Sequence, residues 1–283
     1  MHPETTIRLA RIFHRIVPFA QLRSADWVGR MLNGAELITE TELYGYRALL
    51  DLRRSESRVI FIRGERWVED EPDIVSRVRQ GMTVFDVGAN VGFVTLLLSR
   101  LVGELGRVYA FEPDQDNFAA LQRNLDHNRI SHCVPVNMAA GDRSELVGFA
   151  PGINGFVDAN ATQAVPMTTL DQFVEENGIN RVDFVKIDVE GFELCVLKGM
   201  TRVVRRFKPV LLVEIHPQGF CGAGDPEAVV SCLQQLYGSV KLSIPLSSLP
   251  RRQRLVDLLT RARSRPVRLE DLHPEQRYFA FCE

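Results

Sequence analysis

From residue 83 onward the chain alternates short apolar segments with amphipathic segments of helical length, and this alternation constrains the fold most strongly. Apolar strands that alternate with helices predict a parallel sheet covered by helices on both faces. We expect strands at 83–87, 107–113, 133–139, 182–191, 209–217, 239–245 and 277–283, with helices at 91–102, 115–128, 167–178, 192–206 and 225–238. Thr168 and Asp171 have the spacing of a capping box at the start of the third helix.

The residues before this alternation form an N-terminal extension, predicted at 1–75, and the larger domain is predicted at 76–283. Residues 1–44 are expected to be helical and irregular. The apolar stretches 46–52 and 58–65 are expected to form a β-hairpin, because both are rich in aliphatic residues and polar residues separate them.

Within the extension, residues 5–18 combine apolar and basic side chains. Ile12, Phe13, Ile16 and Val17 share one side of a helix, and three arginines interrupt the apolar run. This pattern excludes a secretory signal with a continuous apolar region. It favours a helix packed on the protein or a partner subunit, and a helix lying on a membrane surface is the alternative.

Charge and cysteine content exclude other classes of protein. The formal net charge of −2 argues against a nucleic-acid binder, because such proteins neutralise phosphates with a basic surface. Five cysteines are widely spaced and no two form a CxxC pair, which argues against a disulfide framework or a zinc site. A reducing compartment, the cytoplasm, is therefore expected.

Polar side chains stand at or just beyond the carboxyl ends of five predicted strands, where parallel α/β sheets bind ligands. They are Asp86, Glu112, Asn137, Asp188, and Glu214 with His216. We expect them to meet at one rim of the sheet.

The first strand leads into the loop G-A-N-V-G, with Gly88, Asn90 and Gly92. A dinucleotide site would have G-x-G-x-x-G and a phosphate-binding P-loop would have G-K-[ST], and the loop matches neither. It suits an adenosyl ligand without phosphates, whose carboxylate would bind backbone amides while Asp86 reaches its ammonium group. Glu112, at the end of the second strand, is placed to pair with two ribose hydroxyls. The alternative is that the glycines serve close packing and Glu112 is a solvated loop residue.

Six segments of the chain, which include the loop and the acids named above, resemble the FkbM-type family of S-adenosylmethionine-dependent methyltransferases. The segments "VFDVGANVGF", "VYAFEPDQDNFAALQRNL", "NMAAGD", "TTLDQF", "VDFVKIDVEGFELCVLKGM" and "PVLLVEIHP" occur in the family's order. The resemblance implies a class I, Rossmann-like sheet of order 3-2-1-4-5-7-6 that binds S-adenosyl-L-methionine. It places Asp86, Gly88, Asn90 and Gly92 on the cofactor loop, Glu112 at the ribose, Asn137 to Asp142 at the adenine, and Asp188 beside the reactive methyl group.

Methyl transfer to a hydroxyl requires a group that accepts its proton. Asp188, Glu190, Glu214 and His216 are the candidates. His216 is either the base, oriented by Glu214, or a residue that only caps its strand. The same four residues could hold a divalent metal, although no metal is favoured because their spacing matches no known motif.

Two basic features have interpretations of their own. Lys186 lies inside a central strand and is expected to form a structural ion pair with Asp188 or Glu214. The stretch 251–268 carries seven arginines and is expected to be a helix between the last two strands. Its arginines are expected to face solvent, and binding an acidic substrate or a carrier domain is the alternative.

Together the residues and the resemblance predict an O-methyltransferase acting on a sugar, glycan or natural-product hydroxyl, with no nucleic-acid partner. Two alternatives stay open. One is an NAD(P)-binding Rossmann oxidoreductase, which the loop spacing disfavours. The other is a non-catalytic adenosyl-binding scaffold, which the intact acids Asp86, Glu112 and Asp188 disfavour.

Overall fold

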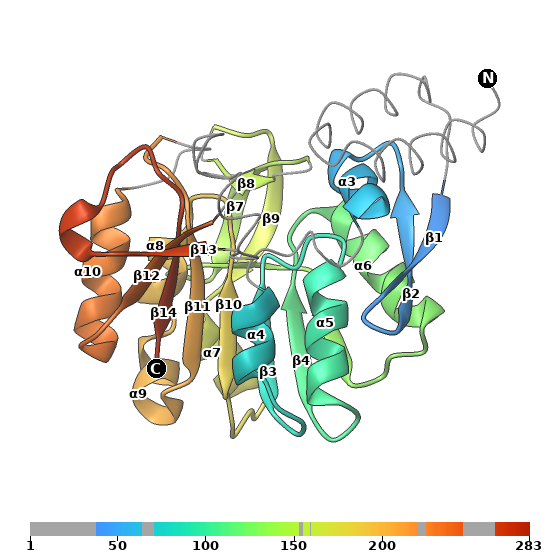
Figure 1. Ribbon diagram of the computed structural model, residues 1–283, viewed down its shortest axis with the longest axis horizontal. Helices are drawn as coiled ribbons and strands as arrows, with labels where there is room; N and C mark the ends of the chain where they lie inside the picture. The colour runs from blue at the N-terminus through green and yellow to red at the C-terminus, as the bar shows by residue number, and fades with distance from the viewer. Residues whose placement is uncertain (1–37, 64–70, 153–154, 159, 220–224, 246–263) are drawn as a thin grey trace.

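The computed structural model describes residues 38–63, 71–152, 155–158, 160–219, 225–245 and 264–283. Over these residues, eight strands form a central sheet in the order β13-β12-β14-β11-β10-β3-β4-β5 (Figure 1). Their bounds are β3 Thr83–Val87, β4 Arg107–Phe111, β5 Cys133–Val136, β10 Phe184–Ile187, β11 Val210–Ile215, β12 Lys241–Pro245, β13 Ser264–Val267 and β14 Tyr278–Cys282. The predicted α/β fold is confirmed.

The middle of this sheet is parallel and one side of it is antiparallel. The five strands β5, β4, β3, β10 and β11 run parallel to one another. β14 pairs antiparallel with both β11 and β12. Numbering the strands without β13 in chain order gives 3-2-1-4-5-7-6. β13 adds an antiparallel edge strand beside β12.

Helices cover both faces of the sheet (Figure 1). On one face, α4 Glu71–Arg77, α5 Phe93–Val102 and α6 Gln115–His127 bury apolar side chains against β3, β4 and β10. On the other face, a second core contains side chains from α7 Leu170–Glu176, α8 Glu193–Lys198, α9 Thr201–Phe207 and α10 Pro226–Tyr237. The carboxyl ends of the parallel strands lie between these two layers.

The helix predicted at 192–206 is two helices, α8 and α9, separated at Gly199 and Met200. A Cβ atom on Gly199 would lie 1.8 Å from the carbonyl oxygen of Gly141, so the chain passes too close for a side chain. The predicted capping box is also wrong. Thr169, not Thr168, caps α7, and the carboxylate of Asp171 accepts from the backbone N–H groups of Arg202 and Val203 in α9.

The N-terminal extension contains a hairpin, but not the predicted one. β1 Ile38–Leu43 pairs antiparallel with β2 Tyr46–Asp51, and residues 55–63 form helix α3 Ser55–Arg63. The strand predicted at 58–65 is therefore wrong, as is the irregular structure expected for 38–43. Val59, Ile60 and Phe61 pack with Leu50 and Leu52 of the hairpin region in one apolar core, so helical packing overrides their strand propensity.

A second, smaller sheet was not predicted. It contains β6 Ala139–Ala140, β7 Glu145–Ala150, β8 Phe156–Val157 and β9 Gln163–Thr168, in the order β6-β9-β7-β8. Val147, Phe149 and Met167 form its own apolar cluster. This sheet stands above the carboxyl end of the central sheet (Figure 1), where it forms one wall of the candidate site.

Some predictions concern residues outside the described ranges. The amphipathic segment 5–18 and most of the arginine-rich stretch, 251–263, belong to this group. The end of that stretch is not the expected helix, because residues 264–267 form strand β13. None of the described helices is both long enough and apolar enough to span a bilayer.

Candidate active site

A pocket opens at the carboxyl ends of β3, β4 and β10. Its walls include the loop after β3, the end of β4, the residues after β10, and the second sheet. It is lined by Val87, Gly88, Asn90, Phe111, Glu112, Pro113, Asn117, Met138, Ala139, Ala140, Phe149, Gly155, Phe156, Val157, Asp188, Val189, Glu190 and Phe192. Four of the predicted site residues, Gly88, Asn90, Glu112 and Asp188, therefore share one pocket.

We call residues 88–92 the donor loop, because the resemblance places the methyl donor beside them. Its backbone N–H groups donate hydrogen bonds to other residues of the protein. The N–H groups of Gly88 and Ala89 donate to the carbonyl of Phe111, at 3.1 and 2.9 Å. The N–H of Asn90 donates to Glu112, at 2.7 Å. These amides are engaged, contrary to the expectation that the turn leaves them for a ligand. Gly88 is required by packing, because its φ is 86° and a Cβ would lie 1.8 Å from the Asp188 carbonyl oxygen.

Asp86, which precedes this loop, and Gly92, its last residue, do not line the pocket. Asp86 is fully buried, and one of its oxygens accepts from the Thr95 hydroxyl at 2.6 Å. Burial raises the pKa of Asp86, although Lys186 acts to lower it. Gly92 faces Leu121 of α6. The other carboxylate oxygen of Asp86 is buried and has no hydrogen-bond partner among the described residues. Contact of Asp86 with the ammonium group of a ligand, directly or through water, stays a prediction.

Glu112 is 5% exposed and lines the pocket. One carboxylate oxygen accepts from Asn90 N–H, and the other accepts from Asp114 N–H at 2.8 Å. Each oxygen keeps capacity for a further hydrogen bond. Burial raises the pKa of Glu112 to about 7, against these backbone hydrogen bonds. The two amides fix the carboxylate in place beside the pocket.

Within the segment 137–142 that the resemblance places at the adenine, Met138, Ala139 and Ala140 line the pocket, whereas Asn137 and Asp142 do not. The Asn137 side-chain amide donates to the carbonyls of Glu112 and Pro113, at 2.8 and 3.2 Å, so it supports the end of β4. Asp142 forms an ion pair with Arg143. The apolar side chains nearby, Phe149, Phe156 and Phe192, line the pocket instead, and sequence reasoning missed them.

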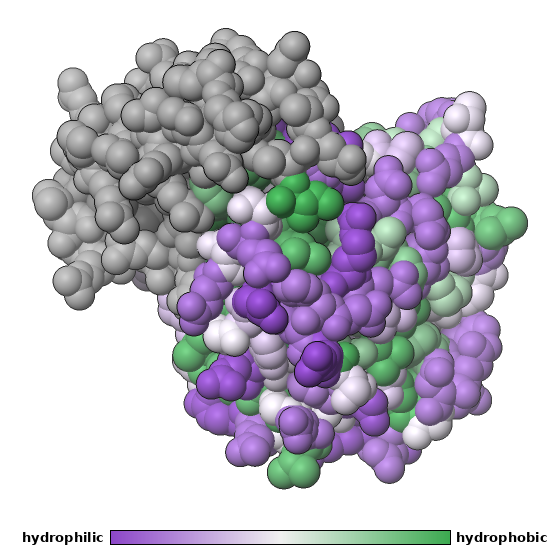
Figure 2. Space-filling model, turned by 90° about the vertical axis from the view of Figure 1, so that its right-hand side faces the viewer, coloured by the Kyte–Doolittle hydropathy of each residue, from purple (hydrophilic) through white to green (hydrophobic). Residues whose placement is uncertain are grey.

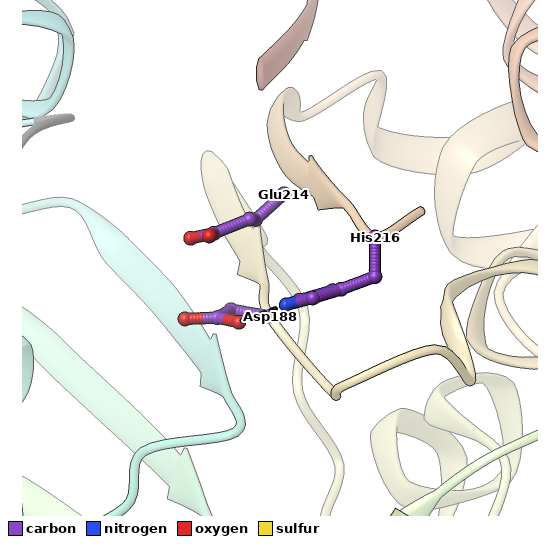
Figure 3. A group of neighbouring side chains, drawn as sticks. All are labelled: Asp188, Glu214 and His216. Atoms are coloured by element: carbon purple, nitrogen blue, oxygen red, sulfur yellow. Dashed lines mark ion pairs between the residues drawn. The ribbon is translucent and has the colours of Figure 1, made fainter. Parts of the chain in front are cut away.

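The ends of β10 and β11 bring Asp188, Glu214 and His216 together, as Figure 3 shows. One ligand atom from each lies within 4.8 Å of the others. Lys186 donates to Asp188 at 3.0 Å, which confirms the predicted ion pair. Arg277 pairs with Glu214 at 2.7 Å. Burial acts to raise the pKa of Asp188, but Lys186 and His216 outweigh it and hold that pKa below its ordinary value.

His216 lies between two further carboxylates. Its Nδ1 is 2.7 Å from Glu193, and its Nε2 is 3.1 Å from Glu190. Burial opposes a charge here, but Glu190 and Glu193 outweigh it and raise the pKa of His216 to about 11. Glu193, rather than Glu214, orients the imidazole. The ring is therefore a cation near pH 7, which does not fit a general base that starts neutral.

The pKa of Glu214 is set by burial and by the same neighbouring charges. Burial and the neighbouring Asp188 raise the pKa of Glu214 to about 8, against Arg277 and His216. Sequence reasoning missed Arg277, which lies far along the chain and reaches Glu214 because β14 returns antiparallel beside β11. It also missed Glu193, although that residue follows Gly191 within the quoted motif.

The same residues decide whether a divalent metal fits. Asp188, Glu214 and His216 form a group with suitable ligand atoms. Each already has a partner of opposite charge, namely Lys186, Arg277 and the Glu190–Glu193 pair. An ion would have to displace Lys186 or Arg277 and remove a proton from His216. The donor set therefore fits the metal poorly, and we derive no step through one.

The known proteins that are similar to this chain in sequence include methyltransferases. Residues 86–236 match the model of the methyltransferase FkbM domain. The hexuronic acid methyltransferase AglP of Haloferax volcanii is 29% identical over 237 residues, which cover 81% of this chain and 92% of the relative. The 31-O-demethyl-FK506 methyltransferase FkbM of Streptomyces tacrolimicus is 30% identical over 159 residues, 44% of this chain and 61% of that relative.

Solved structures with similar folds include methyltransferase FkbM of Methylobacillus flagellatus KT. It is 17% identical with a TM-score of 0.40, covering 81% of this chain and 55% of that one. A SAM-dependent O-methyltransferase of Thermotoga maritima is 14% identical with a TM-score of 0.43, covering 90% of this chain and 80% of that one. On the sequence match over residues 86–236, the chain belongs to the methyltransferase FkbM domain family.

Proposed function

We propose that the protein transfers the methyl group of S-adenosyl-L-methionine to a hydroxyl of a sugar or natural product. One observation supports this most strongly: Glu112 and Asp188 line the same pocket, one at the end of β4 and the other just after β10. This arrangement supports the proposal that Glu112 binds the ribose and that Asp188 faces the reacting group of the same ligand.

The chemistry of the pocket fits this donor. The charged residues among its described lining are Glu112, Asp188 and Glu190, and all three are acids. The donor carries a sulfonium and an ammonium group, so an acidic lining complements its charge. When bound, S-adenosylmethionine supplies an activated methyl group. The protein's task is then to align the acceptor and to manage its proton.

The proton of the acceptor hydroxyl is proposed to pass to a carboxylate that faces the pocket, Asp188 or Glu190. His216 remains an imidazolium and holds Glu190 and Glu193 in place, so it is a positioning residue rather than the base. Lys186 and Arg277 are the cations paired with Asp188 and Glu214 in the same cluster. This assignment follows from the high pKa of His216 and from the contacts of its two ring nitrogens.

The relatives suggest the acceptor class. One relative is named for a hexuronic acid and another for 31-O-demethyl-FK506. We propose a uronic acid or related sugar as the acceptor, with a natural-product hydroxyl as the second candidate. The described cysteines, Cys133, Cys195, Cys232 and Cys282, are all free thiols, which is compatible with the proposed cytoplasmic location.

The test uses the full chain with methyl-labelled S-adenosylmethionine and a panel of hexuronic acids, with neutral hexoses and a polyketide alcohol for comparison. We expect labelled ether product and one S-adenosylhomocysteine per methyl transferred, at a rate unchanged by EDTA. Binding of NADH in place of S-adenosylhomocysteine would favour the oxidoreductase. Tight binding of S-adenosylhomocysteine without transfer to any acceptor would favour the non-catalytic scaffold.

A further inference from the structure

Helix α6 uses asparagine side chains to satisfy the free edge of strand β2. The side chain of Asn128, just after the helix, accepts from Arg47 N–H and donates to Arg47 C=O, both at 2.8 Å. One turn earlier, the Asn124 carbonyl oxygen accepts from Leu49 N–H at 2.8 Å. Four helical residues rise about 6.0 Å and two strand residues about 6.6 Å, so the two spacings match.

Asn124 differs from Asn128 because it has a second partner. It is 1% exposed, and its NH₂ group donates to the carbonyl of Val91 at 2.9 Å. Val91 belongs to the donor loop, between Asn90 and Gly92. One amide therefore joins the N-terminal hairpin to the loop, whereas the bonds of Asn128 to described residues go to the hairpin strand and to α6 itself.

The contacts continue from the donor loop to the ribose acid. Next to Val91, the N–H of Asn90 donates to Glu112 at 2.7 Å. Val91 and Phe93 also share an apolar core with Leu50 and Leu52. The hairpin thus packs against the back of the loop whose front lines the pocket, and the Asn124 amide links the two by hydrogen bonds to Leu49 and Val91. Figure 2 views this side of the molecule, where hydrophilic residues predominate over the described surface.

Resting on the proposed function, we propose that Asn124 is a positioning residue for methyl-donor binding, because its amide ties the donor loop to helix α6 and the hairpin 38–51. Removing the Asn124 side chain leaves Leu49 N–H and Val91 C=O without that partner in a buried place. The donor loop then loses its fixed position, and with it the amide that holds Glu112.

The experiment compares Asn124→Ala with the matched variant Asn128→Ala in the full chain. Calorimetric titration with S-adenosylhomocysteine should show about tenfold weaker binding for Asn124→Ala, as expected when the buried hydrogen bond to the Val91 carbonyl, the one that reaches the loop, is lost. Asn128→Ala should bind within about twofold of the parent, because it loosens the hairpin strand without touching the loop. Equal weakening in both variants, or none in Asn124→Ala, would overturn the proposal.

A third variant, Asn124→Asp, covers the case in which Asn124→Ala does not fold. It keeps the oxygen that accepts from Leu49 N–H and replaces the NH₂ group that donates to Val91. Weakened binding of S-adenosylhomocysteine by this variant supports the proposal, and unchanged binding rejects it.

Amide hydrogen exchange of residues 88–92 separates this inference from the proposed function, because it needs no ligand. We expect exchange in this loop about tenfold faster in Asn124→Ala than in Asn128→Ala. If the parent itself does not bind S-adenosylhomocysteine, the proposed function fails, and the exchange data still decide whether Asn124 holds the loop.

Discussion

The acids at the two ends of the pocket are held by different kinds of group. At one end, backbone N–H groups of Asn90 and Asp114 fix a single carboxylate, Glu112. At the other, Asp188 and its neighbours are fixed by charged side chains, among them Lys186 and His216. A backbone-held acid keeps its lone pairs available for hydroxyls at a fixed place. A network of buried charges holds its members firmly only while every partner is present.

This contrast predicts the largest effect for a broken pair at the ionic end. Lys186→Met leaves Asp188 without its 3.0 Å partner, and the Lys186 side chain is only 4% exposed. We expect the free energy of unfolding to fall by roughly 3–5 kcal/mol, as for other buried pairs that lose one member. Urea unfolding followed by circular dichroism measures it.

Lys241→Met is the matched control for that variant. Lys241 pairs with Glu283 at 3.7 Å, and its side chain is 74% exposed. Its loss should cost less than about 1 kcal/mol. Equal effects of the two substitutions would show that the ionic end is not the buried network described above.

A smaller effect, on binding rather than stability, is expected at the other end. Glu112→Ala removes the acceptor of two ribose hydroxyls and of two backbone amides. Two hydrogen bonds to a charged group, at the lower value of about 1.5 kcal/mol each, contribute about 3 kcal/mol, so the dissociation constant of S-adenosylhomocysteine should rise roughly 100-fold. Calorimetric titration measures it, and an unchanged constant would remove Glu112 from the donor site.

The smallest effect concerns pH. The pKa of Glu112 is raised to about 7 in the free protein, and ribose hydroxyls donate to its ionised form. Donor binding must therefore release a proton below that pKa, and affinity should fall as pH decreases. Between pH 8 and pH 6 we expect about tenfold weaker binding of S-adenosylhomocysteine. Glu112→Gln should bind with little pH dependence in this range, and a dependence that survives in it would point to another group.

The sequence predicted the central sheet because its strands are short apolar runs whose ends carry polar residues. It did not predict the small sheet at 139–168. Two of its strands, Ala139–Ala140 and Phe156–Val157, are too short to show a period, and the two longer ones contain Gly148 and Pro166, which strand patterns disfavour. Residues 58–61 misled it because Arg-Val-Ile-Phe has strand propensity, while packing against Leu50 and Leu52 makes it helical.

The pocket residues that could be predicted from the sequence are those at the ends of strands. Residues at strand ends follow from the alternation of elements, so Glu112 and Asp188 were found. Partners that arrive from elsewhere were missed: Arg277 reaches Glu214 only through the return of β14, and Glu193 comes from the first turn of a helix. The base role of His216 depended on its pKa, which neighbouring carboxylates from other turns decide.

The central claim is that the methyl donor lies in one pocket between Glu112 and Asp188. A crystal structure of the full chain with S-adenosylhomocysteine tests it most directly. The ribose hydroxyls should lie within hydrogen-bond distance of the Glu112 carboxylate, with the sulfur directed toward Asp188 and Glu190. Density for the ligand elsewhere, or a pocket that stays closed to it at saturating concentration, would contradict the claim.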